Sequence, residues 1–368
     1  MGMGELLILS FLFLTSLNCF VTYICSSSCV KRASKQNDYV GAIKRLRKFD
    51  NYLFSSLMMI TAVIYVALSY YYFVSVLKVS DYFISFATIG GFILTLITTF
   101  FSRLCYCYAC NFILKTKLNE YECFVQNAFL LAKIFYPIFI VSFMIPTIYI
   151  FPYSMEIREY IIGGFLAVFV LFYIASTTFF NILSLGARRI KRGKIADFIG
   201  EIFKKHGIKR YRLYYWDSSR SNDSNAMVTG FNKINFFISS SLINSIDDKE
   251  LEAVILHEIG HIKHKHTKKS LINQTIYLFA IVGALYYAII SDNANINILL
   301  IIILVFLLMM GVSLGVSKKQ EDQADLYVAK YGLGDALISA LKKISFGDEE
   351  DLVHGSVSKR EENINKKE

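Results

Sequence analysis

The sequence predicts a polytopic α-helical membrane protein with about seven transmembrane helices and a small α+β domain beside one membrane face. Of its 368 residues 55% are apolar and only three are proline, a composition too apolar for an ordinary soluble enzyme. A helix needs about 20 apolar residues to cross the hydrocarbon core of a bilayer. Seven runs approach or exceed that length: Leu6–Ile24, Leu53–Val76, Tyr82–Phe101, Ala128–Phe151, Tyr160–Leu185, Leu271–Ile290 and Ile296–Val316.

Basic residues occupy alternate loops between these runs, and this pattern predicts the topology. Lysines and arginines gather after the first, fifth and seventh runs, whereas the loops between are short and poor in them. Because basic loops stay in the cytoplasm, we expect the C-terminus and the long polar segments there, with the first run retained as a helix. The basic residues are Lys31, Arg32, Lys35, Lys44, Arg45, Arg47 and Lys48; Arg188, Arg189, Lys191, Arg192 and Lys194; and Lys318 and Lys319.

Topology accounts for the formal net charge of +10, so binding of nucleic acid is not expected. The predicted partners are the lipid bilayer and a peptide or membrane-protein substrate, and the oligomeric state is left open. The predicted location is the plasma membrane, or the endoplasmic reticulum membrane if the host is eukaryotic.

The apolar runs also divide the chain into regions. Residues 1–186 form a membrane region of five helices, and residues 271–316 form a transmembrane hairpin. The hairpin separates two polar pieces, residues 187–270 and 317–368. Because the hairpin returns the chain to the face that it left, we expect both pieces to share one cytoplasmic domain.

Within that domain, local patterns predict helices, strands and a less ordered end. Asp247 followed by Glu250 is typical of a capping box, and it predicts the start of the helix that contains Leu251–His264. The charged end, residues 356–368, is expected to be loosely ordered. The other expected elements are a helix at Ile195–His206 and strands at Tyr211–Trp216, Ala226–Thr229 and Asn235–Ser240.

The capped helix carries a pair of histidines that can share one metal ion. His257 and His261 are four residues apart, so both imidazoles lie on one helix face, one turn from each other. Glu258 follows the first histidine and suits a carboxylate that bonds a metal-bound water. Three protein ligands and an open position are typical of catalytic Zn²⁺. The motif therefore predicts zinc-dependent hydrolysis, with Glu258 as the general base.

A third ligand must come from another part of the chain, and the candidates are His264, His266, Glu321, Asp325 and His354. His264 lies about 10 Å along the helix from His257, too far to share the ion. Glu321 is favoured because it follows the hairpin that returns the chain to the metal's side of the membrane. Asp325, one turn later, can orient a ligand imidazole through its free N–H.

Several short motifs resemble the membrane gluzincin family of the HtpX heat-shock proteases and the type I CAAX prenyl protease. They are Asn225-Ala226 before Thr229-Gly230, Glu250-Leu251 before His257-Glu258-Ile259-Gly260-His261, and Glu321 with Ala324-Asp325. The resemblance covers about Trp216 to Ile364 and implies a zincin-like metalloprotease domain. The helix number and the hairpin position are similar to those of the CAAX enzyme.

The resemblance also implies roles for individual residues. His257, His261 and Glu321 would be zinc ligands, Glu258 the base, and Asp325 a partner of a ligand. Asn225-Ala226 would lie on an edge strand that pairs with substrate. His354, Arg360 and Ile364 fit the family's C-terminal His-Pro motif, although Gly355 stands in place of the proline. His354 would contact the substrate or the oxyanion, or it is a surface histidine.

The leading functional hypothesis is an endopeptidase that cuts membrane-associated or misfolded membrane proteins. Processing of prenylated peptides is the alternative within the enzyme class, and a non-catalytic membrane scaffold or transporter is the alternative outside it. Cys105, Cys107 and Cys110 are closely spaced, but three thiols without a fourth ligand favour packing or acylation over metal binding.

Overall fold

The computed structural model describes residues 3–36, 84–113, 181–220, 223–230, 233–270, 317–344 and 356–365, with isolated positions between 41 and 65, 157 and 178, and 272 and 276. The chain divides into two compact units, Met1–Ala175 and Ser176–Glu368. Five of the seven expected membrane runs lie wholly or mostly outside the described residues, so the seven-helix plan stays a prediction.

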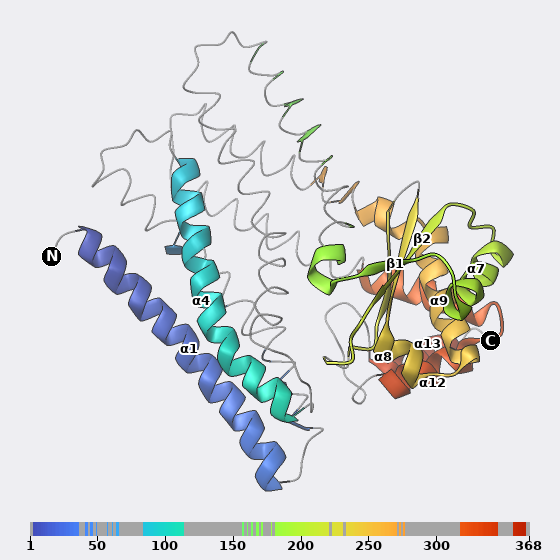
Figure 1. Cartoon of the computed structure of the whole chain (residues 1–368), viewed down its shortest axis with the longest axis horizontal. Helices are drawn as coiled ribbons and strands as arrows, with labels where there is room; N and C mark the ends of the chain where they lie inside the picture. The colour runs from blue at the N-terminus through green and yellow to red at the C-terminus, as the bar shows by residue number, and fades with distance from the viewer. Residues whose placement is uncertain are drawn as a thin grey trace. The chain divides into compact units, whose positions relative to one another are not determined.

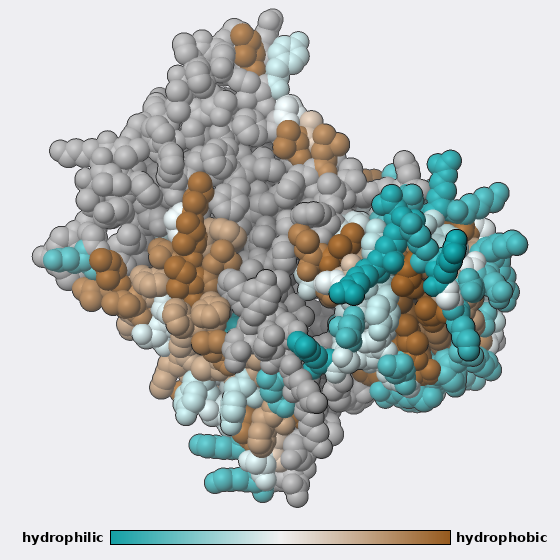
Figure 2. Space-filling view, in the orientation of Figure 1, coloured by the Kyte–Doolittle hydropathy of each residue, from teal (hydrophilic) through white to brown (hydrophobic). Residues whose placement is uncertain are grey.

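In the first unit, two long apolar helices lie side by side, α1 (Met3–Gln36) and α4 (Ile84–Ile113) (Figure 1). Within them, Ile8–Lys35 and Ile89–Ile113 are long and apolar enough to cross a membrane. Large apolar side chains remain exposed on them, such as Phe13 at 66%, and brown atoms mark much of their visible surface in Figure 2. An apolar surface of this kind is suited to contact with lipid chains.

Polar side chains bond α1 to α4 and to two residues between them in the sequence, Thr61 and Tyr65. The Tyr65 hydroxyl lies 3.2 Å from Thr15 Oγ1 and 3.0 Å from Thr98 Oγ1, and the two threonine oxygens are 3.0 Å apart. Asn18 donates to Thr61 Oγ1 at 3.0 Å. Such bonds hold neighbouring helices together where no water can compete.

The cysteines of α1 and α4 are free thiols in the part of the chain that the structure describes. Cys107 and Cys110 are buried, and Cys110 packs beside Cys29 in a small apolar cluster. This placement agrees with a packing role for two of the three closely spaced thiols.

The second unit contains a four-stranded sheet with the order β1-β2-β4-β3 (Figure 1). The strands are β1 (Arg188–Ile190), β2 (Tyr211–Trp216), β3 (Ala226–Thr229) and β4 (Ile234–Ser239). β2 and β4 are parallel, while β1 and β3 pair antiparallel with β2 and β4 respectively. Two predicted strands have the observed bounds, and the third begins and ends one residue earlier than expected, because Ser240 begins a helix.

β1 was not predicted, because its two arginines gave it the composition of a basic loop. In the structure Arg188 and Arg189 point into solvent while Ile190 is half-buried, and the segment is held by its pairing with β2.

Helices pack on the sheet around one apolar core. They are α7 (Lys194–Lys205), α8 (Ser240–Ser245), α9 (Asp248–Lys263), the helix of residues 317–329, α12 (Gly334–Ile344) and α13 (Val357–Asn365). Phe203, Phe236, Ile255, Ile259 and Leu337 are at most 1% exposed in this core. The core therefore joins α7, β4, α9 and α12, and it fixes α9 firmly in place. Hydrophilic side chains dominate the visible outer surface of this unit (Figure 2).

The predicted capping box starts α9. The Asp247 carboxylate accepts from the Glu250 backbone N–H at 2.9 Å, and the Glu250 carboxylate accepts from that of Asp247 at 2.9 Å. Glu250 is 3% exposed and also accepts from Ser339 at 2.6 Å and Lys343 at 2.7 Å, both on α12. Burial alone would raise the pKa of Glu250, but these hydrogen bonds and the Lys343 charge lower it below its ordinary value.

The charged C-terminal segment is better ordered than expected. Residues 357–365 form α13, and both Arg360 and Ile364 are buried, at 6% and 0% exposure. The expectation of a loose end was wrong over this stretch, because Arg360 finds a buried acidic partner 35 residues earlier, Asp325.

Candidate metal centre

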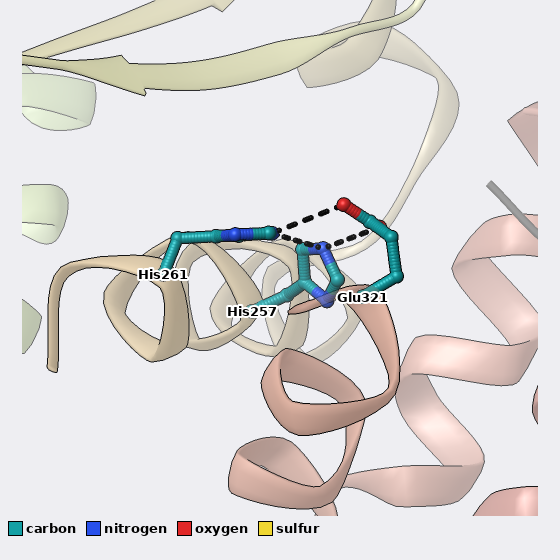
Figure 3. A group of neighbouring side chains, drawn as sticks. All are labelled: His257, His261 and Glu321. Carbon is teal, nitrogen blue, oxygen red and sulfur yellow. Dashed lines mark hydrogen bonds and ion pairs between the residues drawn. The ribbon is translucent and has the colours of Figure 1, made fainter. Parts of the chain in front are cut away.

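The two histidines of α9 and one glutamate of the helix of residues 317–329 meet at one point (Figure 3). The Nε2 atoms of His257 and His261 are 3.2 Å apart. The two carboxylate oxygens of Glu321 divide between them: Oε2 lies 3.4 Å from His257 Nε2, and Oε1 lies 3.4 Å from His261 Nε2. His257 and Glu321 are buried, and His261 is half-buried.

These separations fit a tetrahedral metal ion. Ligand atoms at about 2.0–2.2 Å from such an ion are about 3.3–3.6 Å apart. The two Nε2 atoms have nearly this separation, and so does each Nε2 atom from one of the two carboxylate oxygens. His257, His261 and Glu321 are also the only group of three potential ligands with such mutual proximity among the described residues. The donor set, two imidazoles and one carboxylate, is one that divalent transition metals favour.

A buried acidic and basic pair stands behind His257. Asp325 is 1% exposed, and its Oδ1 lies 2.9 Å from His257 Nδ1. Arg360 donates to both oxygens of the same carboxylate, from Nε at 2.8 Å and from Nη2 at 2.6 Å. Burial alone would raise the pKa of Asp325, but His257 and Arg360 lower it, so the carboxylate stays ionised. Asp325 therefore fixes the His257 ring from the side away from the meeting point.

The charge balance at this point favours a cation. Burial by itself would lower the pKa of His257, but Asp325 and Glu321 outweigh burial and raise it to about 10. In the protein without metal, a proton is thus held between two buried carboxylates. A divalent cation would replace that proton and be attracted by the same charges.

His266 does not join the ligand group, although it was one of the candidate third ligands. It is 3% exposed, and its Nδ1 lies 2.8 Å from Nδ1 of His261, the nitrogen that faces away from Glu321. His266 Nε2 lies 2.9 Å from Gln323 Oε1. Burial lowers the pKa of His266 below its ordinary value, which favours the neutral ring. His264 stacks on His266 with ring centroids 5.5 Å apart, and it is not part of the ligand group either.

The remaining predicted site residues lie as follows. Glu258 follows His257 on α9 and is 9% exposed. Asn225 is exposed, and its backbone N–H donates to Ser239 Oγ at 2.9 Å. Ala226 begins β3. This strand lies at one edge of the described sheet and packs near α9. His354 lies outside the described residues.

The sequence predicted that Glu321 lies near the histidines, but it did not reveal how closely α9 and the helix of residues 317–329 approach each other. A Cβ atom on Gly260 would lie 2.9 Å from Cα of Ala324 and 3.2 Å from Cβ of Tyr327. Gly260 therefore lets α9 and the helix of residues 317–329 nearly touch. Two small residues, Gly260 inside the histidine motif and Ala324 between Glu321 and Asp325, were the available signal in the sequence.

An α+β domain in which two histidines of one helix meet a glutamate of a later helix has the arrangement of a metallopeptidase. Residues 189–367 match the family described as Peptidase family M48. A protein named "Protease HtpX homolog" from Bacteroides fragilis (strain YCH46) is 28% identical over 214 residues, which cover 52% of this chain and 65% of that protein. "Protease HtpX" from Hahella chejuensis is 26% identical over 165 residues, 41% of this chain and 55% of its own.

The fold of the whole chain resembles a solved structure. It is the crystal structure of S. mikatae Ste24p, and the alignment covers 99% of this chain and 99% of that one. The TM-score is 0.59 and the sequence identity is 18%. At this identity the likeness concerns the fold. Together these comparisons support membership of the HtpX and CAAX protease family of membrane metallopeptidases, as the sequence motifs predicted. The chain spans 65% of the length of the Bacteroides relative.

Proposed function

We propose that this chain is a zinc-dependent membrane endopeptidase that cuts membrane-associated or misfolded membrane proteins. The observation that carries the proposal is the meeting of His257, His261 and Glu321 at 3.2–3.4 Å, on a helix that also carries Glu258. Their donor set and spacing suit Zn²⁺ in a catalytic site. A role for the helices alone, as in a scaffold, would not require this buried and charged arrangement.

The residues of the site have separable tasks in this proposal. Bound zinc would polarise the scissile carbonyl and lower the pKa of a water toward about 7. Glu258 accepts the proton of that water and returns it to the leaving amine. Asp325 holds the ring of His257 through Nδ1, so that Nε2 stays directed at Glu321.

Substrate would bind along β3. This strand lies at the end of the described sheet and near α9, so an extended peptide paired with it would run past the ligand group. Asn225 and Ala226 would supply the first backbone contacts. We further propose that the domain faces the cytoplasm, as the basic loops predict.

The test replaces Glu258 with glutamine. Glu258→Gln should retain zinc and lose about 10²- to 10⁴-fold in peptidase rate, because the ligands remain while the proton acceptor is gone. Glu252→Gln is the matched control on the same helix, since Glu252 pairs with the exposed Lys205 at 3.5 Å. Both variants are assayed for zinc content and for chelator-sensitive cleavage of casein and of a membrane protein. Near-normal activity of zinc-loaded Glu258→Gln would contradict the mechanism.

The same assay distinguishes between the alternative classes of substrate. A farnesylated peptide with a C-terminal CAAX sequence is offered beside its unmodified form. Preference for the farnesylated form over casein and the membrane protein would move the proposal to prenylated peptides. Failure of the zinc-loaded wild-type protein to cut any of them would favour the scaffold.

A further inference from the structure

A second imidazole stands behind one of the two ligand histidines. The side of His261 that faces away from Glu321 carries Nδ1, and His266 Nδ1 lies 2.8 Å from it. The other nitrogen of His266 lies 2.9 Å from Gln323 Oε1. Gln323 is only two residues from Glu321. A chain of polar side chains thus connects the far nitrogen of His261 to the helix that supplies the carboxylate ligand.

The direction of the hydrogen bonds in this chain follows from metal binding. To coordinate through Nε2, a neutral His261 must carry its proton on Nδ1 and donate it. His266 Nδ1 must then be the acceptor, so the proton of His266 is on Nε2. That N–H requires an acceptor, and the carbonyl oxygen of Gln323 is in place at 2.9 Å. Every bond of the chain is therefore satisfied in the one tautomeric arrangement that leaves His261 Nε2 free for a metal.

The opposite direction would not permit coordination. If the amide nitrogen of Gln323 faced His266, it would donate to Nε2 and place the His266 proton on Nδ1. His261 Nδ1 would then accept, and its own proton would sit on Nε2, where the metal should bind. The side-chain oxygen of Gln323 thus selects the binding-competent form of His261 through His266.

We propose that His266 and Gln323 are positioning residues that hold His261 in the tautomer and orientation required to bind the metal. The inference rests on the proposed zinc site and deepens it. The two ligand histidines then have different partners. His257 contacts the charged Asp325, whereas His261 contacts the imidazole of His266, which is hydrogen-bonded to the side-chain amide of Gln323. Partners of this kind typically change metal affinity about 10- to 100-fold when they are removed.

The first test compares two histidines on the same segment. His266→Phe keeps a flat ring but removes both hydrogen bonds, and His264→Phe is the matched control because His264 is not part of the ligand group. The zinc dissociation constant of the full chain in detergent is measured by competition with a chromophoric chelator, beside the thermal midpoint of the metal-free protein. His266→Phe should bind zinc about 10- to 100-fold more weakly, with a metal-free midpoint close to that of His264→Phe.

The second test replaces Gln323, which is only half-buried, so that folding does not decide the result. Gln323→Glu keeps an acceptor toward His266 and should bind zinc at least as tightly as wild type, whereas Gln323→Leu should bind it more weakly. The double variant His266→Phe with Gln323→Leu should be no weaker than His266→Phe alone, because Gln323 acts through His266.

Equal zinc affinities of His266→Phe and His264→Phe, or losses that add in the double variant, would overturn this inference while the zinc site stands. A wild-type protein that binds no zinc would overturn the proposed function and the inference with it.

Discussion

At the scale of single residues, the carboxylate of Glu321 contacts both His257 and His261. Glu321 directs one oxygen at each Nε2 atom, at equal distances of 3.4 Å, so it is symmetrically placed between the rings. Asp325 is one turn further on the same helix and contacts His257 from the opposite side. In the proposed site, Glu321 would therefore complete the ligand group, and Asp325 would support the ligand His257.

We predict that the two carboxylates can be told apart by metal content. Glu321→Ala should lower the zinc stoichiometry sharply, because two histidines alone leave the ion with too few ligands. Asp325→Ala should weaken zinc affinity about 10- to 100-fold. Asp322→Ala is the control on the same helix, since Asp322 bonds Asn363 at 3.1 Å and not a histidine. Zinc analysis of the purified proteins decides it.

The same measurement includes His354, the remaining candidate ligand. His354→Ala should keep its zinc. If zinc were lost from His354→Ala and kept by Glu321→Ala, the ligand role would pass to His354.

At the scale of elements, the site depends on how closely two helices approach. Glu321 reaches the histidines because α9 and the helix of residues 317–329 nearly touch at Gly260 and Ala324. The capping box and the Glu250 bonds to Ser339 and Lys343 fix the start of α9 independently of this contact. A change at Gly260 should therefore move the later helix and leave the start of α9 in place.

We predict that Gly260→Ala both destabilises the protein and weakens metal binding. The added Cβ would meet backbone at 2.9 Å, so the helices must separate, at a cost of about 1–3 kcal/mol. Gly200→Ala in α7 is the control, because its Cβ would meet only the hydroxyl end of the Tyr211 side chain. Helix propensity should make that control neutral or stabilising by up to about 1 kcal/mol. Thermal unfolding and zinc affinity of both variants are compared, and normal zinc affinity in Gly260→Ala would show that the spacing is not required.

At the scale of the whole molecule, the two units differ in their surfaces. The unit with α1 and α4 exposes large apolar side chains on helices long enough to cross a membrane, whereas the unit with the sheet has a largely hydrophilic surface (Figure 2). Each surface suits a different solvent, lipid for one and water for the other.

We predict from the basic loops that Lys35, the segment around His257 and Lys359 face the cytoplasm, and that Asn293 faces the other side. Single cysteines are placed at these positions in a cysteine-free chain and labelled with a membrane-impermeant reagent. Labelling of positions 293 and 359 from the same side would contradict the hairpin and the positive-inside topology.

The sequence by itself determined the features that depend on near neighbours. The bounds of β2 and β3 follow from local patterns, and the start of α9 follows from Asp247 and Glu250, three residues apart. The helical repeat likewise placed His257 and His261 on one face, because four residues make about one turn. The lengths of two apolar runs also predicted the two apolar helices that the structure describes in the first unit.

Tertiary structure alone decided the features that need partners far along the chain. β1 exists through its pairing with β2, and α13 is ordered where Arg360 meets Asp325. The separation of Glu321 from the histidines depends on the packing of α9 against a helix more than 50 residues later. The same packing places His266 between His261 and Gln323, outside the group of three potential ligands. Local propensity cannot encode these distances, because they result from side chains that meet only after the core has formed.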